Sequence, residues 1–534
     1  MNKDSTVDTN KFEICTLLKD IYPSAEIEEK YEPVYEDLRN KYRNLFSKTD
    51  PAMIVRVPYT ITLFGDNITK MFPDKIVSNL SSDVVFFINK NTTDELNVKF
   101  FDNFYEFKAP IASFDLATVS KKEGEEVELK DFIINGYMSG LVQSKIKKYY
   151  GANILILLNT TNTDNNFDLF ISAFLASMLS AMYLNNSLPK SKQNFYETAL
   201  LSLSSLIKDK MSYYSSYLYF KIFLKKNSLG FSIGNTFFQN EIENYSKFKQ
   251  FVFDSFSPRP IMAYSSGHYW NKRKVECRLG MALILKRYNE SITEEELIAK
   301  TSDISTFYKC FDNNAEIVLQ MLETYLKQEM YTKQEIKDEL KIDLIKLLKG
   351  IDFPDGALMT HEFFLYNRLY FVFKEYQTVM TLYAQSRIND KIDWVEMLSK
   401  SGELMKEKYD CYSEEMKALS KKLKETHKKI GIRAISDGWS GQMVVVGIKE
   451  EVALVDKEIY NYYEKYNENM GDNLVSAWIS DDLNRYCFSS DFGNCICLLD
   501  TKYEDFMLEY VTMKNNVIKP ENAEEIQNNF LKNK

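Results

Sequence analysis

The sequence predicts an α+β fold in which strands and helices interleave through both halves of the chain. Short apolar runs rich in β-branched residues, such as 84–89 (VVFFIN) and 443–448 (MVVVGI), are typical of buried strands. Segments with apolar residues at helical spacing lie between such runs, for example at 414–429. The 534 residues are 45% hydrophobic and 27% charged, so the chain can bury a large core and is not of the disordered class.

The first half of the chain is predicted to alternate helices and strands behind a polar, acidic N-terminal extension, residues 1–30. Helical spacing predicts the helices and apolar runs predict the strands. Pro58 is expected to end the first strand because it has no backbone N–H. The predicted elements are a helix at 35–46, strands at 53–58, 84–89 and 96–101, a helix at 131–150, a strand at 154–158 and a helix at 170–184.

The second half is predicted to be more helical, and it ends in a polar tail, residues 501–534. We expect the chain between the extension and the tail to form an N-terminal lobe over 31–235 and a C-terminal lobe over 236–500. The predicted elements are helices at 271–288, 294–300, 315–328, 333–349, 361–386, 392–405 and 414–429, strands at 443–448 and 451–454, a helix at 456–466 and strands within 475–500.

Charge and cysteine content narrow the classes of function. The formal net charge of -9 argues against a simple basic nucleic-acid binder. The seven cysteines form no disulfide framework and complete no metal-ligand set, so we expect reduced thiols and no metal site. The chain starts without an apolar leader and has no uncharged apolar run of about 18 residues. We therefore predict a soluble, cytoplasmic protein with no membrane partner.

Five segments of the chain resemble, in the same order, signature motifs of the galactokinases. Residues 56–69 (RVPYTITLFGDNIT) are similar to the first signature, and 431–441 (GIRAISDGWSG) are similar to a glycine-rich motif near the C-terminus. The resemblance implies the two-lobed fold of the GHMP small-molecule kinases, with a ribosomal-protein-S5-like N-terminal lobe, a ferredoxin-like C-terminal lobe and the active site between them. The other three segments are 269–277 (YWNKRKVEC), 361–373 (HEFFLYNRLYFVF) and 408–416 (KYDCYSEEM).

The resemblance also assigns candidate site residues. The active-site arginine of the family falls on Thr60. The sugar-binding part of the first signature falls on Asp66, Asn67 and Thr69, which are the substrate-binding candidates. In the C-terminal motif, the degenerate nucleotide-binding candidates are Gly431, Arg433, Gly438 and Gly441.

The phosphate-binding loop of the family is the feature that this sequence lacks. No glycine occurs between Gly151 and Gly230, whereas a backbone that wraps phosphates needs residues without a Cβ. The polar loop after the strand at 154–158 instead contains Asp164 and Asp168, which would repel a triphosphate unless a metal ion bridges them. The simpler interpretation of Asp168 is that of a helix cap.

The catalytic aspartate of the family falls on Tyr217, so no catalytic residue is expected. Asp209 is a nearby acid and the candidate for a replacement base, and its simpler interpretation is a solvated helix charge. Phosphoryl transfer depends on positioning and on neutralising the developing charge. The joint loss of the arginine, the aspartate and the loop glycines removes each of these contributions.

Three hypotheses about function remain open. The first is a catalytically inactive galactokinase-like protein that acts as a binding or regulatory factor and needs no cofactor. The second is an active ATP-dependent galactose or N-acetylgalactosamine kinase, with Asp66 holding the sugar, Asp209 as base, and ATP and Mg as cofactors. The third is a non-catalytic sensor of a sugar or a nucleotide.

In the first hypothesis the partner is a sugar, a nucleotide or a macromolecule, and we expect a macromolecule. The abundance of Asn, Lys, Tyr and Ile is similar to that of microsporidian proteins, and this resemblance implies a ribosome-associated dormancy (hibernation) factor that contacts rRNA. Segment 144–150 combines basic and aromatic groups, as nucleic-acid contacts do, and 421–429 is lysine-rich. A solvated lysine face at a helix end is the alternative for both segments. The RNA-contact candidates are Lys145, Lys147, Lys148, Tyr149 and Tyr150.

Overall fold

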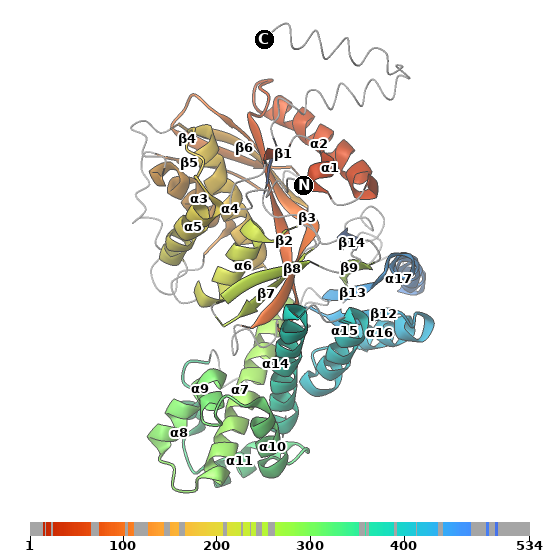
Figure 1. Cartoon of the computed structure of the whole chain (residues 1–534). Coiled ribbons are helices and arrows are strands. Elements are labelled where there is room, and N and C mark those ends of the chain that lie inside the picture. The colour runs from red at the N-terminus through yellow and green to blue at the C-terminus, as the bar shows by residue number, and fades with distance from the viewer. Residues whose placement is uncertain are drawn as a thin grey trace, which may run out of the picture.

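The computed structural model shows a mixed α and β protein in which two sheets and a group of helices occupy distinct parts of the molecule (Figure 1). It describes residues 14–15, 18–22, 25–65, 74–101, 105–111, 127–143, 150–159, 166–206, 211–225, 228–234, 236–241, 248–254, 262–351, 358, 362–388, 392–412, 414–435, 442–470, 487–490 and 497–499. Within these ranges, no helix is both long enough and apolar enough to cross a lipid bilayer.

The larger sheet has nine strands among the described residues, in the order β1-β15-β2-β3-β6-β4-β5, with β7 pairing with β3 and β8 pairing with β7. Its pairs are antiparallel except β1 with β15 and β4 with β6. The strands are β1 (Ile14–Cys15), β15 (Cys497–Leu499), β2 (Met53–Phe64), β3 (Lys75–Lys90), β6 (Ala152–Asn159), β4 (Glu95–Phe100), β5 (Glu106–Pro110), β7 (Ser228–Ile233) and β8 (Thr236–Glu241).

Helices bury both faces of this sheet. Because successive side chains of a strand point to opposite faces, Phe86 of β3 joins the core beneath helices α3 to α6, and Phe87 joins a second core beneath α1 and α2. Burial on both faces explains why the part of β3 at 84–88 reads as an unbroken apolar run. The helices are α1 (Leu18–Ile21), α2 (Ala25–Leu45), α3 (Leu129–Gln143), α4 (Asn166–Leu184), α5 (Lys192–Leu206) and α6 (Met211–Phe223).

The smaller sheet is antiparallel and has four strands among the described residues, in the order β12-β13-β9-β14. Helices α15, α16 and α17 pack beside it (Figure 1). The bounds are β12 (Ile430–Ala434), β13 (Gln442–Ile448), β9 (Phe248–Asp254), β14 (Cys487–Ser490), α15 (Trp394–Leu404), α16 (Glu414–Thr426) and α17 (Lys449–Met470); a π-helical turn, η3 (Met405–Tyr409), continues α15.

The remaining helices form a group that projects away from the two sheets, with α7 and α14 packed side by side as its stem (Figure 1). The elements of this group are α7 (Met262–Tyr288), α8 (Glu294–Lys300), α9 (Ile304–Lys309), α10 (Ala315–Tyr325), β10 (Tyr331–Thr332), α11 (Lys333–Leu340), α12 (Leu344–Leu347), β11 (Glu362–Phe363) and α14 (Leu365–Arg387).

Most of the predicted elements are confirmed, but three predictions were wrong. The single helix predicted at 333–349 is two helices, α11 and α12, because Lys341 adopts a left-handed conformation that ends α11. Strand β2 does not end at Pro58; it continues to Phe64, because a register shift between Pro58 and Thr60 accommodates the missing N–H. The segment predicted as a strand at 451–454 belongs to α17, because Val452 and Val455 lie at helical spacing and are both buried.

Two of the predicted domain boundaries fall within continuous structural units. Helix α2 runs through the boundary placed between residues 30 and 31. The hairpin of β7 and β8 pairs Ile233 with Thr236 across the boundary placed between residues 235 and 236. Strand β15, late in the chain, pairs with β2, so a segment assigned to the second lobe completes the sheet of the first.

Candidate functional site

A cluster of buried polar side chains, here called the polar centre, lies where β2, the first turn of α4 and α6 meet. Its ion pair joins Asp168 of α4 to Lys221 of α6, with 2.9 Å between Nζ and Oδ2 and side-chain exposures of 4% and 0%. The Lys221 ammonium also donates to the carbonyl of Pro58 at 2.7 Å, and the backbone N–H of Thr60 donates to Asp168 Oδ2 at 3.3 Å. The irregular part of β2 therefore supplies both backbone partners of the pair.

Burial governs the electrostatics of this pair. Desolvation raises the pKa of the Asp168 carboxyl against the opposing effect of Lys221, and it lowers the pKa of the Lys221 ammonium against the opposing effect of Asp168. Each charge therefore depends on the other, because an isolated ion in the interior is strongly disfavoured. Asp168 Oδ1 has no hydrogen-bond partner among the described residues.

The position of Asp168 differs from that of the expected helix cap. Helix α4 begins at Asn166, so Asp168 lies inside its first turn, where the helix dipole favours a negative charge. Its Oδ2 atom accepts from β2 and from Lys221 of α6. No local pattern in the sequence pointed to Lys221, since the two partners are 53 residues apart.

The other members of the polar centre contact one another. Tyr217 Oη and Thr62 Oγ1 lie 2.8 Å apart, and Thr60 Oγ1 donates to Asn79 Oδ1 at 2.8 Å. The ammonium of Lys75 lies 3.6 Å from the centroid of the Tyr217 ring. These five residues are all exposed by 5% or less. Thr60 and Tyr217 are thus both buried. The resemblance places the family's active-site arginine on Thr60 and its catalytic aspartate on Tyr217.

Arg433, a predicted nucleotide contact, lies inside the protein at the junction between the smaller sheet and β2. Its Nη2 atom is 3.1 Å from Glu375 Oε1, with both side chains fully buried, and its Nη1 atom donates to the carbonyl of Leu63. Glu375 also accepts from the backbone N–H of Gly65 at 2.9 Å and from Ser401 Oγ at 2.7 Å. This cluster joins β12, α14, α15 and the end of β2.

Gly431, the second described nucleotide candidate, lets α15 approach β12 closely. A Cβ atom on Gly431 would lie 2.7 Å from the carbonyl oxygen of Val395. From the other side of the contact, a Cβ atom on Gly402 would lie 2.4 Å from the carbonyl oxygen of Ile432. The two glycines therefore account for the close packing of this helix on this strand.

Two of the segments that carry the resemblance meet in a second buried charge cluster, around Glu276 of α7. Glu276 Oε2 accepts from Arg273 Nη1 at 2.8 Å and from Arg368 Nε at 3.1 Å, and Oε1 accepts from the backbone N–H of Phe364 at 3.0 Å. Burial acts to raise the pKa of Glu276, but Arg368 and Arg273 outweigh it, and the pKa lies below its ordinary value. These residues tie α7 to α14.

Of the predicted RNA-contact residues, the structure describes Tyr150. Its side chain is exposed, its ring lies 5.0 Å from the ammonium of Lys90, and its carbonyl accepts from Tyr137 Oη at 3.0 Å. The other predicted site residues lie outside the described ranges and stay predictions: Asp66, Asn67, Thr69, Asp209, Gly438, Gly441, Lys145, Lys147, Lys148 and Tyr149.

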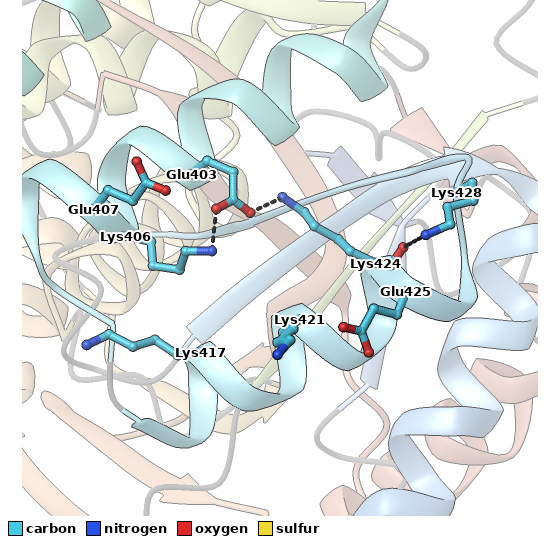
Figure 2. Close-up of a pocket in the computed structure, with 8 residues that line it drawn as sticks. All are labelled: Glu403, Lys406, Glu407, Lys417, Lys421, Lys424, Glu425 and Lys428. Atoms are coloured by element: carbon cyan, nitrogen blue, oxygen red, sulfur yellow. Dashed lines mark hydrogen bonds and ion pairs between the residues drawn. The ribbon is translucent and has the colours of Figure 1, made fainter.

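A pocket of about 570 Å³, here called the lysine pocket, opens between α16 and the end of α15 with η3 (Figure 2). Charged side chains alone line it, and part of the lysine-rich segment noted in the sequence is among them. The lining residues are Glu403, Lys406, Glu407, Lys417, Lys421, Lys424, Glu425 and Lys428. No group of histidine, cysteine, aspartate and glutamate side chains in the described part of the chain is arranged to hold a metal ion.

No protein-family model and no curated protein matches this chain. Among solved structures, the galactokinase of Lactococcus lactis, determined with galactose, matches with a TM-score of 0.54 and 12% identity over 87% of this chain and 99% of that chain. The mevalonate kinase of Methanococcus jannaschii matches with a TM-score of 0.42 and 12% identity, covering 77% and 95% of the two chains. The galactokinase match confirms the predicted α+β, two-lobed GHMP-kinase fold.

Proposed function

We propose that this protein of the GHMP-kinase fold is catalytically inactive and acts as a binding or regulatory factor. The observation that carries the proposal is the ion pair between Asp168 and Lys221, which is closed off from solvent at the start of α4. In a kinase of this fold, the same turn would have to present backbone N–H groups and positive charge to a nucleotide. Here the positive charge is already neutralised by an internal carboxylate.

The other groups of the polar centre support the same conclusion. Phosphoryl transfer needs cations that neutralise charge as it develops and a base aligned with the acceptor hydroxyl. The ammonium groups of Lys221 and Lys75 are both buried, the first against Asp168 and the second over the ring of Tyr217. The resemblance places Tyr217 at the position of the family's catalytic aspartate, and a phenol hydrogen-bonded to Thr62 is a poor general base at neutral pH.

Incubation of the full chain with radiolabelled ATP, magnesium and a panel of hexoses that includes galactose and N-acetylgalactosamine tests this proposal. We expect no hexose-dependent transfer of label above a blank without protein. The control variant is Asp338→Asn, which changes an exposed aspartate on α11. The proposal would be overturned if label is transferred by the wild type and by this control, but not by Asp168→Asn or Asp209→Ala.

One observation favours the alternative of an active sugar kinase. Asp168 Oδ2 binds Lys221, while Oδ1 has no hydrogen-bond partner among the described residues. A carboxylate with a vacant acceptor atom beside a lysine is an arrangement that a general base can use. In this alternative ATP and Mg are required, and turnover that survives Asp209→Ala but not Asp168→Asn would assign the base to Asp168.

A sugar or nucleotide sensor would keep ligand binding without turnover. A ligand that binds only the folded chain raises the melting temperature by mass action, and a concentration about 100 times Kd contributes about 2.7 kcal/mol. Galactose and ATP with magnesium are therefore each titrated in a thermal-shift experiment. A saturable shift with no transfer of label would identify the sensor, and no shift at millimolar ligand would exclude it.

The proposed binding factor requires a partner, and the ribosome, through rRNA, is the partner that the resemblance implies. Co-sedimentation of the full chain with purified ribosomes tests it, and binding to RNA phosphates should weaken as salt rises. Ribosome binding lost in a variant with Lys145, Lys147 and Lys148 all changed to alanine would assign the contact to segment 144–150. Absence of the protein from the ribosome pellet at low salt would remove the ribosome from this proposal.

A further inference from the structure

The lysine pocket is built from two helical segments whose charged faces meet. Lys417, Lys421, Lys424 and Lys428 follow one another at intervals of four, three and four residues, so they lie on one face of α16 and the turn after it. The opposite face of α16 is buried through Met416, Leu419 and Leu423. Helix α16 is therefore fixed by its apolar side while its lysine face borders the pocket.

The facing wall contains a π-helical turn. Helix α15 passes directly into η3, and this turn contributes Lys406 and Glu407 to the lining. Asp410, in a left-handed conformation with φ of 56°, ends the turn. A π-helical turn of this kind is an ordinary way for a helix to end. The turn places a fifth ammonium group opposite the lysine face of α16.

Glu403 organises two of the ammonium groups. Its Oε1 atom accepts from Lys424 Nζ at 2.7 Å, and its Oε2 atom is paired with Lys406, so both lysines are directed at one carboxylate (Figure 2). Burial acts to raise the pKa of Glu403, but the hydrogen bonds from Lys406 and Lys424 outweigh it and lower the pKa. Two cations from different segments are thus held close together by a carboxylate that stays ionised.

Of the remaining lysines, Lys417 is paired with Glu414 at 2.9 Å and with Asp410 at 3.7 Å, whereas Lys421 and Lys428 keep donors available to a ligand. Lys421 is exposed, and it has no partner among the described residues. Lys428 donates to the carbonyl of Lys424 at 3.1 Å, which uses only one of the three donors of its ammonium group. With five lysines and three glutamates the lining has a net charge of +2, in a chain whose net charge is -9.

We propose that the lysine pocket binds a compact ligand with two or more neighbouring phosphate groups. Lysine ammonium groups bind phosphate as point charges, and several of them lining one hollow suit adjacent phosphates better than a single anion. The volume of about 570 Å³ lies within the range of small-molecule sites. The pocket shares no residue with the polar centre, so this proposal stands whether or not the protein transfers phosphate.

Isothermal titration calorimetry of the full chain with tripolyphosphate tests the proposal. Sulfate at equal ionic strength is the comparison ligand. We expect saturable binding of tripolyphosphate that weakens at higher salt, and at least tenfold weaker binding of sulfate. In Lys421→Glu the Kd for tripolyphosphate should rise by about tenfold or more, since a charged hydrogen bond is replaced by a repulsion. Lys337→Glu, an equal charge change at an exposed position of α11, should leave the Kd unchanged.

Thermal unfolding of both variants shows whether either has lost its fold, and Lys406→Ala serves as a second variant on the opposite wall. Absence of saturable binding, or equal weakening in Lys421→Glu and Lys337→Glu, would overturn the proposal. A third arm uses a single-stranded RNA oligonucleotide. One result in this arm would also overturn the proposal: the RNA binds in a way that depends on Lys421, while tripolyphosphate neither binds nor displaces it. The pocket would then recognise an extended nucleic-acid backbone.

Discussion

The polar centre and the lysine pocket both contain lysines and carboxylates, but they satisfy these charges in different ways. In the polar centre, Lys221 and Asp168 are removed from water and each is held by the other. In the lysine pocket, Lys421 is exposed and has no partner among the described residues. A buried charge has to be matched within the protein, whereas an exposed charge remains available to a ligand. The charges of the first region therefore stabilise the fold, whereas Lys421 in the second remains accessible from solvent.

Buried ion pairs of this kind also occur in the segments that resemble galactokinase motifs. Arg433 and Glu276 lie in two of these segments, and both are buried in charge clusters that join helices and strands. Residues of this kind preserve a fold independently of catalysis, because losing one partner leaves the other unmatched in the interior. Similarity at such positions is informative about architecture and much less so about chemistry.

Replacing Lys221 by alanine is the strongest test of the comparison. The Asp168 carboxylate would remain buried without its cation, and we expect the free energy of unfolding to fall by about 3–5 kcal/mol. Chemical denaturation of the variant beside the wild type measures this loss. The double variant Asp168→Asn with Lys221→Met should recover part of the stability, since it leaves no unmatched charge. A single variant as stable as the wild type would mean that the pair does not hold the polar centre together.

Acid titration examines the cluster around Glu276. Its pKa is lowered in the folded state, so it contributes stability above the ordinary pKa of a glutamate, about 4.3, and that contribution is lost as pH falls through the folded value. We expect Glu276→Gln to be less stable by about 3 kcal/mol at pH 7, because Arg273 and Arg368 lose their carboxylate. Its stability should also depend less on pH below about 4 than that of the wild type. Parallel acid-unfolding curves for the two proteins would contradict this assignment.

The stability of Gly431→Ala measures how much the protein depends on the close packing of α15 against β12 at this glycine. The added methyl would meet the carbonyl oxygen of Val395 at 2.7 Å, and we expect a loss of about 1–3 kcal/mol. The matched control is Gly447→Ala on β13, where the shortest contact is 3.1 Å and a smaller loss is expected. Thermal unfolding of both variants makes the comparison. Equal stability of Gly431→Ala and the wild type would remove the packing explanation for this glycine.

Lys421→Ala should have the smallest effect on stability. Like Lys221→Ala it replaces a lysine by alanine, so the two variants differ only in the surroundings of the lysine. Lys421 is exposed and has no partner among the described residues, so we expect its removal to change the free energy of unfolding by less than about 0.5 kcal/mol. Denaturation curves of the two alanine variants, recorded side by side, give the contrast directly. A large loss in Lys421→Ala would show that this lysine has a structural role and would weaken its assignment to ligand binding.

The sequence by itself determined the class of fold and the main features of the core. The apolar run at 84–89 predicts a strand, and it forms the second half of β3, where the structure buries Phe86 and Phe87 on opposite faces. Helical spacing predicts the apolar helix at 170–184, which is most of α4. The absence of glycine between Gly151 and Gly230 is likewise a property of the sequence alone. Local periodicity and composition carry this information because neighbouring residues share one element and one environment.

Only the tertiary structure decided which charges meet. Asp168 was predicted to cap its own helix, and it instead pairs with Lys221 in another helix. Arg433 was predicted to contact a nucleotide, and its guanidinium is enclosed with Glu375. Three lysines of 421–429, Lys421, Lys424 and Lys428, line a pocket whose other wall is formed by the end of α15 and by η3. The partner of a charged side chain is set by contacts between segments distant in the chain, and no local pattern encodes whether that partner is a residue, water or a ligand.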